Sequence, residues 1–275
     1  MTTARSISIM GSIGKSALDV IRHANVSGQI RFQITALVAG SDVDLLASQA
    51  KEFRPKIAVI ADEARLPELR ERLAGTGVET AAGETAISEA ASRPVDRVVA
   101  AIVGSAGLAS TYAAVKAGND IAIANKESIV SGGQLILTEA RKTGAQILPV
   151  DSEHSAIFQC LGDGRQLEKL TITASGGPFR MASLSDMRHA TPEQAAAHPN
   201  WDMGIKNSID SASLMNKALE FIEAAYLFQV DGRDIDVLIH PQSIVHGMAH
   251  FRDGSVIAQL GAPDILRAVR RQRQY

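Results

Sequence analysis

The fold is decided by residues 5–42, which read RSISIMGSIGKSALDVIRHANVSGQIRFQITALVAGSD. The apolar runs at residues 6–10 and 32–39 are short and rich in Ile, Val and Leu, which is typical of strands buried on both faces. Between them lie a glycine turn and an amphipathic segment that predicts a helix over residues 15–23. A strand, a helix and a second strand in this order predict a parallel sheet.

The same alternation continues through the first half of the chain. Further strands are predicted at residues 56–60, 97–103, 120–124 and 145–150, and helices at 42–51, 63–73 and 107–117. This pattern predicts an α/β fold with a Rossmann-like, doubly wound parallel sheet, whose ligands bind outside the carboxyl ends of the strands.

After Val150 the pattern changes. A strand is predicted at residues 169–174, a long helix at 211–228, and two apolar runs follow at 237–239 and 255–260. We therefore expect a Rossmann-like domain over residues 1–150 and an α/β catalytic domain over 151–264.

Composition narrows the function class. The 275 residues include 28 Lys and Arg against 30 Asp and Glu, so no general basic field indicates a nucleic-acid partner. No apolar run approaches the roughly 20 residues of a membrane helix, and the single cysteine, Cys160, fits a reducing compartment. We expect a cytoplasmic enzyme that acts on a small molecule, without a membrane or nucleic-acid partner.

The glycine turn at residues 11–14 has two competing interpretations beyond a plain tight turn. Gly14, Lys15 and Ser16 resemble the end of a P-loop, but that motif needs a glycine at position 9, which is Ile. A dinucleotide-binding loop needs three spaced glycines, and here there are two. The spacing argues against a P-loop kinase, and the turn alone decides nothing further.

Two carboxylates directly follow the strand predicted at residues 145–150. Asp151 and Glu153 are two apart, so on an extended chain both side chains point to the same side and can converge on one ion. Oxygen donors of this kind suit Mg²⁺ or Mn²⁺. The alternative is a pair of surface acids, and we expect the adjacent His154 to be a supporting or structural residue.

The helix predicted at residues 211–228 is apolar nearly all round, as in a buried helix. Its polar exceptions Asn216, Glu220 and Glu223 share one face, with Lys217 beside them. Because an unpaired buried charge is costly, this stripe predicts a site or a salt-bridge network. The alternatives are a third metal carboxylate with a phosphate-binding lysine, or a structural Lys217–Glu220 pair.

Two further segments carry polar groups without periodicity. Ser175, Gly176 and Gly177 follow a strand and could form an anion-binding nest. Residues 198–204 hold the only tryptophan, Trp201, which belongs either to a core or to a lid over a ligand.

Taken together, six stretches resemble the 1-deoxy-D-xylulose 5-phosphate reductoisomerase family. They occur in the family's order: AIANKESIV (122–130), PVDSEHSAIFQC (149–160), TASGGPFR (173–180), HPNWDMG (198–204), DSASLMNKALEFIEA (210–224) and IHPQSIVH (239–246). The resemblance implies conversion of 1-deoxy-D-xylulose 5-phosphate to 2-C-methyl-D-erythritol 4-phosphate in non-mevalonate isoprenoid synthesis. It also implies NADPH, a divalent metal (Mn²⁺, Mg²⁺ or Co²⁺) and, for an intact chain, a homodimer.

The resemblance further implies a role for individual residues. The metal ligands are Asp151, Glu153 and Glu220. The catalytic residues are Lys126, Glu153, His198 and Trp201. The residues that bind the sugar phosphate are Lys126, Ser152, Glu153, Ser175, His198, Ser211, Asn216, Lys217 and Glu220. The cofactor-binding residues are Gly11, Ser12, Ile13, Gly14, Gly40, Asn125, Glu127 and Gly204.

The chain departs from the family pattern in three places. Its glycine loop is about three residues shorter, so we expect weaker pyrophosphate binding. Asp42 lies where the family often has a basic residue and Asn, which disfavours the 2′-phosphate of NADPH. Residues 265–275 form an aberrant basic tail, and we expect the family's C-terminal helical domain to be absent. The alternative to a working enzyme is therefore a truncated, impaired homologue that retains only sugar-phosphate or metal binding.

Overall fold

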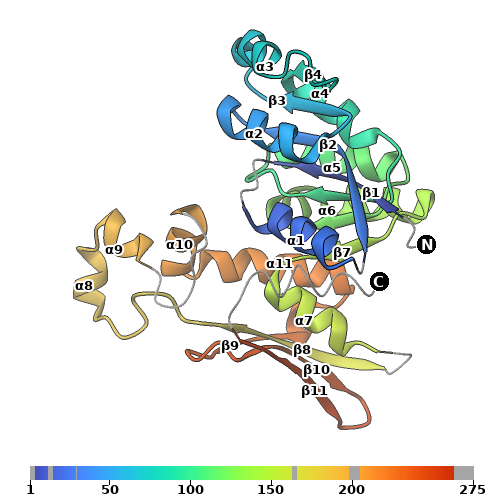
Figure 1. Ribbon diagram of the computed structural model, residues 1–275. Helices are drawn as coiled ribbons and strands as arrows, with labels where there is room; N and C mark the ends of the chain where they lie inside the picture. The colour runs from blue at the N-terminus through green and yellow to red at the C-terminus, as the bar shows by residue number, and fades with distance from the viewer. Residues whose placement is uncertain (1–3, 12–14, 29, 163–165, 198–204, 263–275) are drawn as a thin grey trace. The chain divides into compact units, whose positions relative to one another are not determined.

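The computed structural model describes residues 4–11, 15–28, 30–162, 166–197 and 205–262 (Figure 1). It divides into two compact units, Met1–Val150 and Asp151–Tyr275. Among the described residues, we find no helix with the length and apolar character needed to cross a membrane. Ser12, Ile13, Gly14, His198, Trp201, Gly204 and the tail at 265–275 lie outside the described residues, so their predicted roles and structure stay predictions.

The first unit contains a seven-stranded sheet in which every neighbouring pair is parallel, with the order β4-β3-β2-β1-β5-β6-β7. The strands are β1 (Ala4–Met10), β2 (Arg31–Ala39), β3 (Ile57–Ile60), β4 (Glu79–Ala82), β5 (Arg97–Ala100), β6 (Ile121–Ile123) and β7 (Ile147–Pro149). The predicted doubly wound parallel sheet is confirmed. Strand β4 was not predicted, since its sequence ETAA lacks the Ile and Val of the other strands.

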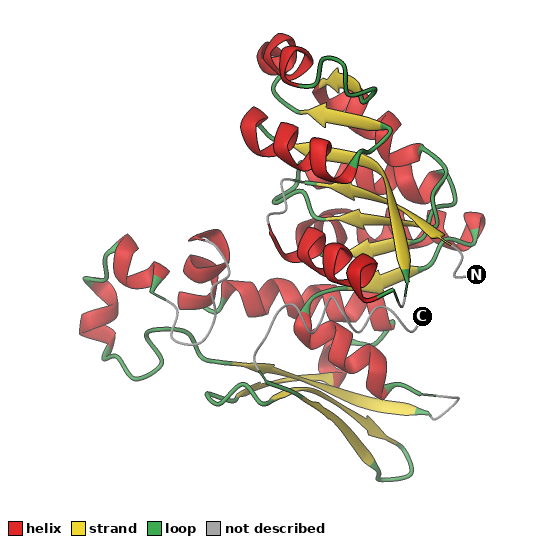
Figure 2. Ribbon diagram, viewed as in Figure 1, coloured by secondary structure: helices red, strands yellow, loops and turns green. Residues whose placement is uncertain are grey.

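Helices cover both faces of this sheet, with α1 and α2 on one side and α4, α5 and α6 on the other (Figure 2). The helices are α1 (Lys15–Ser27), α2 (Val43–Phe53), α3 (Leu66–Arg72), α4 (Gly83–Ser92), α5 (Gly107–Lys116) and α6 (Lys126–Thr143), with a 3-10 turn η1 at Glu63–Arg65. The single helix predicted at residues 63–73 is therefore wrong in detail, because it divides into η1 and α3, with a proline at the start of α3. Ile9, Leu37 and Ile60 are among the buried residues that join sheet and helices in one core.

The strand order reverses at β1, whose neighbours are β2 and β5. In sheets of this kind the crevice at the reversal binds the ligand. Gly11 ends β1 at this point with φ +124°, and a Cβ there would lie 2.5 Å from the carbonyl oxygen of Ala101, just beyond β5. Only glycine permits both the backbone angle and the close approach.

The second unit is built on a four-stranded mixed sheet with the order β11-β10-β8-β9. Strands β8 (Leu167–Ala174) and β9 (Ile235–Ile239) are parallel, whereas β10 (Val245–Phe251) pairs antiparallel with β8 and with β11 (Val256–Leu260). The remaining elements are α7 (Ser152–Cys160), α8 (Leu184–Arg188), α9 (Pro192–Ala196), α10 (Ile205–Ala212), α11 (Met215–Phe228) and the 3-10 turn η2 (Gly232–Asp234).

Helices α7 and α11 share one core with this sheet. Ile157 of α7 and Ala224 of α11 are fully buried in a cluster that includes Leu170 and Ile172 of β8 and Phe251 of β10. Because this shared packing fixes both helices on the sheet, it also fixes the polar residues that they carry.

The helix predicted over residues 211–228 is present only from Met215 to Phe228, and its predicted start is wrong. Helix α10 ends at Ala212 and α11 begins at Met215, with Leu214 between them in the left-handed region at φ 60°. The Ser213 hydroxyl donates to the carbonyl oxygen of Asp210 at 3.2 Å. Serine offers the backbone such alternative hydrogen bonds and so favours helix ends. Ser211 therefore lies on α10, and the predicted polar stripe lies on α11.

Candidate metal centre and surrounding site

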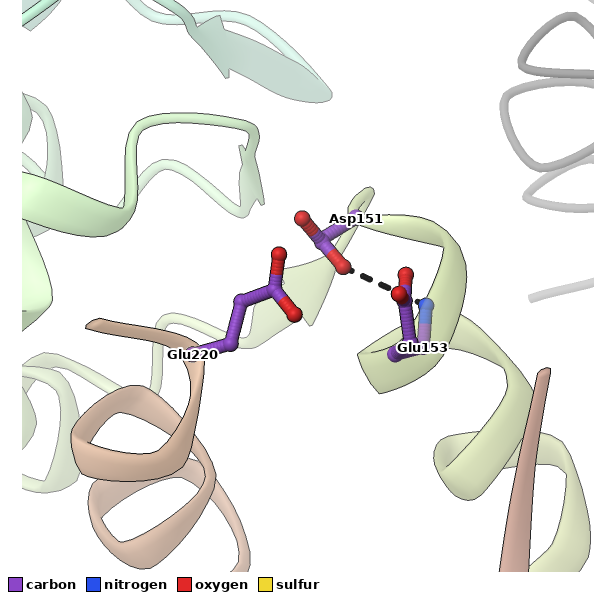
Figure 3. Close-up of side chains that lie close together, drawn as sticks. All are labelled: Asp151, Glu153 and Glu220. Carbon is purple, nitrogen blue, oxygen red and sulfur yellow. Dashed lines mark hydrogen bonds between the residues drawn. The ribbon is translucent and has the colours of Figure 1, made fainter. Parts of the chain in front are cut away.

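Three carboxylates converge in the second unit (Figure 3). Asp151, Glu153 and Glu220 each offer an oxygen, and these oxygens lie within 4.8 Å of one another. Asp151 precedes the first turn of α7 and Glu153 lies in that turn, whereas Glu220 comes from the middle of α11. Carboxylates more than 60 positions apart in the chain thus form one oxygen-rich cluster of the kind that holds Mg²⁺ or Mn²⁺.

The predicted reason for the convergence of Asp151 and Glu153 is wrong. The chain is not extended here, because α7 begins at Ser152 and Asp151 is its N-cap. The Asp151 carboxylate accepts a hydrogen bond from the backbone N–H of Glu153 at 3.2 Å, as N-cap residues do. A helix start, and not strand alternation, brings the two acids together.

Lys217 lies among the three carboxylates. Its Nζ is 2.6 Å from Oε1 of Glu153 and also forms an ion pair with Glu220, and its side chain is 7% exposed. The Lys217–Glu220 pair considered from the sequence is therefore present, but the same ammonium also contacts a second carboxylate. One ammonium among three carboxylates leaves two formal negative charges, which a divalent cation would balance.

Burial and the neighbouring carboxylates raise the pKa of Glu153. Burial, together with repulsion from Glu220 and Asp151, raises the pKa of Glu153 to about 7, although Lys217 acts in the opposite direction. A carboxylate that is costly to ionise in the absence of a cation is the expected property of a metal ligand set.

Helix α11 buries the face that carries its charged side chains. Lys217, Glu220 and Glu223 are buried, whereas Met215 and Ile222 on the same helix are 52% and 40% exposed. The prediction of a helix buried all round is therefore wrong, while its polar stripe does face inward. Asn216 donates to Oε1 of Glu220 and so belongs to the same network.

His154 is fully buried beside the carboxylates. Its Nδ1 lies 3.4 Å from an oxygen of Asp151 and 3.4 Å from an oxygen of Glu223, and its Nε2 lies 2.9 Å from the carbonyl oxygen of Glu220. Burial lowers the pKa of His154, but the carboxylates of Glu223 and Asp151 outweigh it and raise the pKa to about 9. The sequence indicated a supporting role for His154 and left Glu223 without one.

A glycine turn lies beside the end of α10. Gly176 and Gly177 have φ values of +88° and +66°, and a Cβ on Gly177 would lie 2.6 Å from the carbonyl oxygen of Ser211. The backbone N–H of Gly177 donates to the hydroxyl of Ser175 at 3.4 Å. The structure thus places the Ser175 loop against Ser211, two of the residues predicted to bind phosphate.

In the first unit, Asn125 has a structural task. Its amide donates to the carbonyl oxygens of Ile102 and Gly104, and its Oδ1 accepts from the backbone N–H of Ser128 at 2.6 Å, which caps α6. Asn125 therefore holds the loop after β5, at the edge of the predicted cofactor crevice. Lys126 and Glu127 form the first turn of α6, and Lys126 is buried.

Gly40 lies just beyond β2, at the same edge of the sheet. Its carbonyl oxygen accepts from the backbone N–H of Asp62 at 3.1 Å. Asp42 caps α2 by accepting from the N–H of Leu45 at 2.9 Å. The Asp42 carboxylate, which the sequence predicted to disfavour the 2′-phosphate of NADPH, is thus hydrogen-bonded to the N-terminus of α2.

Comparison with known proteins agrees with this fold. The family model for 1-deoxy-D-xylulose 5-phosphate reductoisomerase matches residues 7–133, and the model for the C-terminal domain of that enzyme matches residues 147–228. The 1-deoxy-D-xylulose 5-phosphate reductoisomerase of Sinorhizobium medicae is 52% identical over 261 residues, which cover 94% of this chain and 66% of the relative. The chain belongs to the 1-deoxy-D-xylulose 5-phosphate reductoisomerase family. The resemblance seen in the sequence is thereby confirmed.

Solved structures of reductoisomerases show the same fold. A crystal structure of the enzyme in complex with NADPH, fosmidomycin and magnesium has a TM-score of 0.91 at 43% identity, covering 96% of this chain and 68% of that one. The reductoisomerase from Zymomonas mobilis in complex with NADPH has a TM-score of 0.88 at 46% identity, covering 97% and 69%. Our chain spans about two thirds of the length of the curated reductoisomerases that it matches.

Proposed function

We propose that this chain catalyses the NADPH- and divalent-metal-dependent isomerisation and reduction of 1-deoxy-D-xylulose 5-phosphate to 2-C-methyl-D-erythritol 4-phosphate, in isoprenoid biosynthesis. Its family membership supports this activity, and the observation that carries it is the cluster of Asp151, Glu153 and Glu220. The proposal includes an NADPH-binding domain at residues 1–150 and a catalytic domain at 151–264. It also includes a homodimer in the cytoplasm.

The donor set fits a divalent metal. Asp151, Glu153 and Glu220 supply oxygens, and the two formal charges left by Lys217 match Mg²⁺, Mn²⁺ or Co²⁺. When bound, the ion supplies Lewis-acid polarisation of the substrate oxygens and a template for them. The helix starts and ion pairs described above hold the three carboxylates in place for this purpose.

The phosphate of the substrate is assigned to the second unit. The Ser175 hydroxyl, the Gly176–Gly177 turn and Ser211 lie together there. Asn216 and Lys217 complete the group on α11. A cation at the carboxylates would compete with the Lys217 ammonium and leave it available to the phosphate. Phosphate contacts of this kind supply binding energy away from the reacting carbons. Ser152 and Lys126 are assigned to the sugar portion of the substrate. His198 and Trp201 are assigned to the loop that closes over the substrate.

The first unit is assigned to NADPH, which supplies the hydride for the reduction. Gly11 allows a close approach of the backbone at the end of β1 to Ala101, just beyond β5, and Asn125 fixes the loop that follows β5. Both lie where the strand order reverses, which is where sheets of this kind bind their ligand. Gly40 and Glu127 are assigned to the same cofactor, together with Ser12, Ile13, Gly14 and Gly204.

The deciding experiment is NADPH oxidation, followed by absorbance, with 1-deoxy-D-xylulose 5-phosphate and Mn²⁺. We expect turnover with the wild-type chain and none with Glu220→Gln, which keeps the size of the side chain but loses its charge. Glu168→Gln, an exposed acid on β8, is the matched control and should retain turnover. A folded chain that binds Mn²⁺ and sugar phosphate without turnover would instead support the impaired homologue.

A further inference from the structure

His154 is a buried imidazole that links the two helices of the candidate metal centre. It belongs to α7, close behind Asp151 and Glu153, and its ring is 0% exposed. A histidine in this position can serve stability alone, as a well-packed core residue. The contacts of His154 differ from those of a core residue, because its ring contacts two candidate metal ligands: Asp151, which caps α7, and Glu220 of α11.

Helix α11 contacts the ring through two polar groups and one stacked aromatic ring. The carbonyl oxygen of Glu220 lies 2.9 Å from Nε2 and can only accept, so Nε2 carries a hydrogen. An oxygen of Glu223 lies 3.4 Å from Nδ1. The ring of Phe228 stacks on the imidazole with centroids 6.1 Å apart and an interplanar angle of 21°.

The held ring in turn faces Asp151. Its Nδ1 lies 3.4 Å from Oδ1 of Asp151, the same oxygen that accepts from the backbone N–H of Glu153. Two contacts on one oxygen restrict rotation of the carboxylate. The contacts from Glu223 through His154 to Asp151 thus connect one candidate ligand to Glu220, whose backbone the same ring touches.

We propose that His154 and Glu223 are positioning residues that fix Asp151 relative to Glu220 and thereby set the affinity of the centre for a divalent cation. This inference rests on the proposed function, since it takes the three carboxylates as metal ligands. Neither residue is assigned to the metal or the substrate. Residues that orient metal ligands typically contribute about 10–100-fold to metal affinity.

The test is a Mn²⁺ titration without substrate or NADPH, in which the EPR signal of unbound Mn²⁺ gives the dissociation constant. His154→Gln and Glu223→Gln are compared with the wild type, and thermal unfolding in EDTA is measured in parallel. Two variants serve as controls. His250→Gln removes an imidazole of the same unit whose Nε2 lies 2.9 Å from Thr171 Oγ1, and Phe228→Leu removes the stacking while leaving the polar contacts.

We expect both test variants to weaken Mn²⁺ binding about 10–100-fold, whereas both controls bind within about twofold of the wild type even where they lower the Tm. Lower Tm values for the test variants with an unchanged dissociation constant would overturn the inference, because the pair would then serve stability alone. Glu223→Gln keeps the size and an acceptor oxygen of the side chain, so it decides the question if His154→Gln does not fold.

The two proposals fail in different ways. If the wild type binds no Mn²⁺, or Glu220→Gln binds it as tightly as the wild type, the metal centre itself is wrong. If Glu220→Gln loses binding while Glu223→Gln and His154→Gln keep it, only the positioning role is wrong.

Discussion

Removing the ammonium of Lys217 should make the stability of this protein depend on a divalent cation. The side chain is 7% exposed and contacts both Glu153 and Glu220, so Lys217→Met leaves buried carboxylates without their counter-charge. Removal of one partner from a buried ion pair costs about 3–5 kcal/mol. For a chain of this size that loss lowers the Tm by roughly 6–20 °C, at about 2–4 °C per kcal/mol.

A cation should restore most of this loss. Mn²⁺ at about one hundred times its dissociation constant adds about 2.7 kcal/mol of stability. The variant has no ammonium for Mn²⁺ to displace, so its Tm should rise more on saturation than that of the wild type. The assay is thermal unfolding in EDTA and in a Mn²⁺ series.

Lys206→Met provides the control for this prediction. Lys206 pairs with Asp210 at 2.7 Å at a more exposed position, so the loss should stay below about 1 kcal/mol and should not depend on Mn²⁺. The reasoning is refuted if Lys217→Met is as stable in EDTA as the wild type, or if Mn²⁺ raises both Tm values equally.

Three other outcomes are expected. In EDTA the free energy of unfolding should fall as the pH rises from about 4.5 to about 7. Burial raises the pKa of Glu153 to about 7, so in this range the folded chain keeps a proton that the unfolded chain has lost. In Glu153→Gln, unfolding curves measured over the same pH range should show a free energy that no longer falls in this way. Gly177→Ala should weaken binding of inorganic phosphate in calorimetry, since its Cβ would lie 2.6 Å from a carbonyl oxygen at φ +66°, whereas Gly254→Ala, with open space around it, should not. Gly11→Ala should weaken NADPH binding measured by fluorescence, because its Cβ would lie 2.5 Å from the Ala101 carbonyl oxygen, while Gly28→Ala has no neighbour within 4 Å and should leave binding intact.

The sequence was sufficient to predict six of the seven strands of the first sheet. Strand β3 (Ile57–Ile60) and the last four residues of β2 (Arg31–Ala39) are continuous runs of apolar residues, and burial on both faces produces that pattern in a parallel sheet. The polar stripe of α11 was also predictable from the sequence, because residues three and four apart share one face of any helix. β4 escaped prediction because its composition does not carry this signal.

Helix ends were harder to predict than helix interiors. The break between α10 and α11 depends on a left-handed Leu214 and on Ser213, whose hydroxyl donates to the carbonyl oxygen of Asp210, and the apolar periodicity runs across this break. The start of α7 at Ser152 likewise depends on the Asp151 cap. The acids were correctly singled out while the reason for their convergence was wrong, since spacing in the sequence does not show where a helix begins.

The sequence by itself determined the α/β class and singled out the candidate ligands, because periodicity and residue type act over a few positions and leave a local record. The family followed from six stretches that resemble it. Only the tertiary structure decided that Lys217 contacts two carboxylates and that His154 joins Asp151 to α11. The Lys217–Glu153 and His154–Glu220 contacts join residues more than 60 positions apart, and they form because α7 and α11 pack into one core on the second sheet. Packing of that kind is a property of the whole unit and has no signature at any single position.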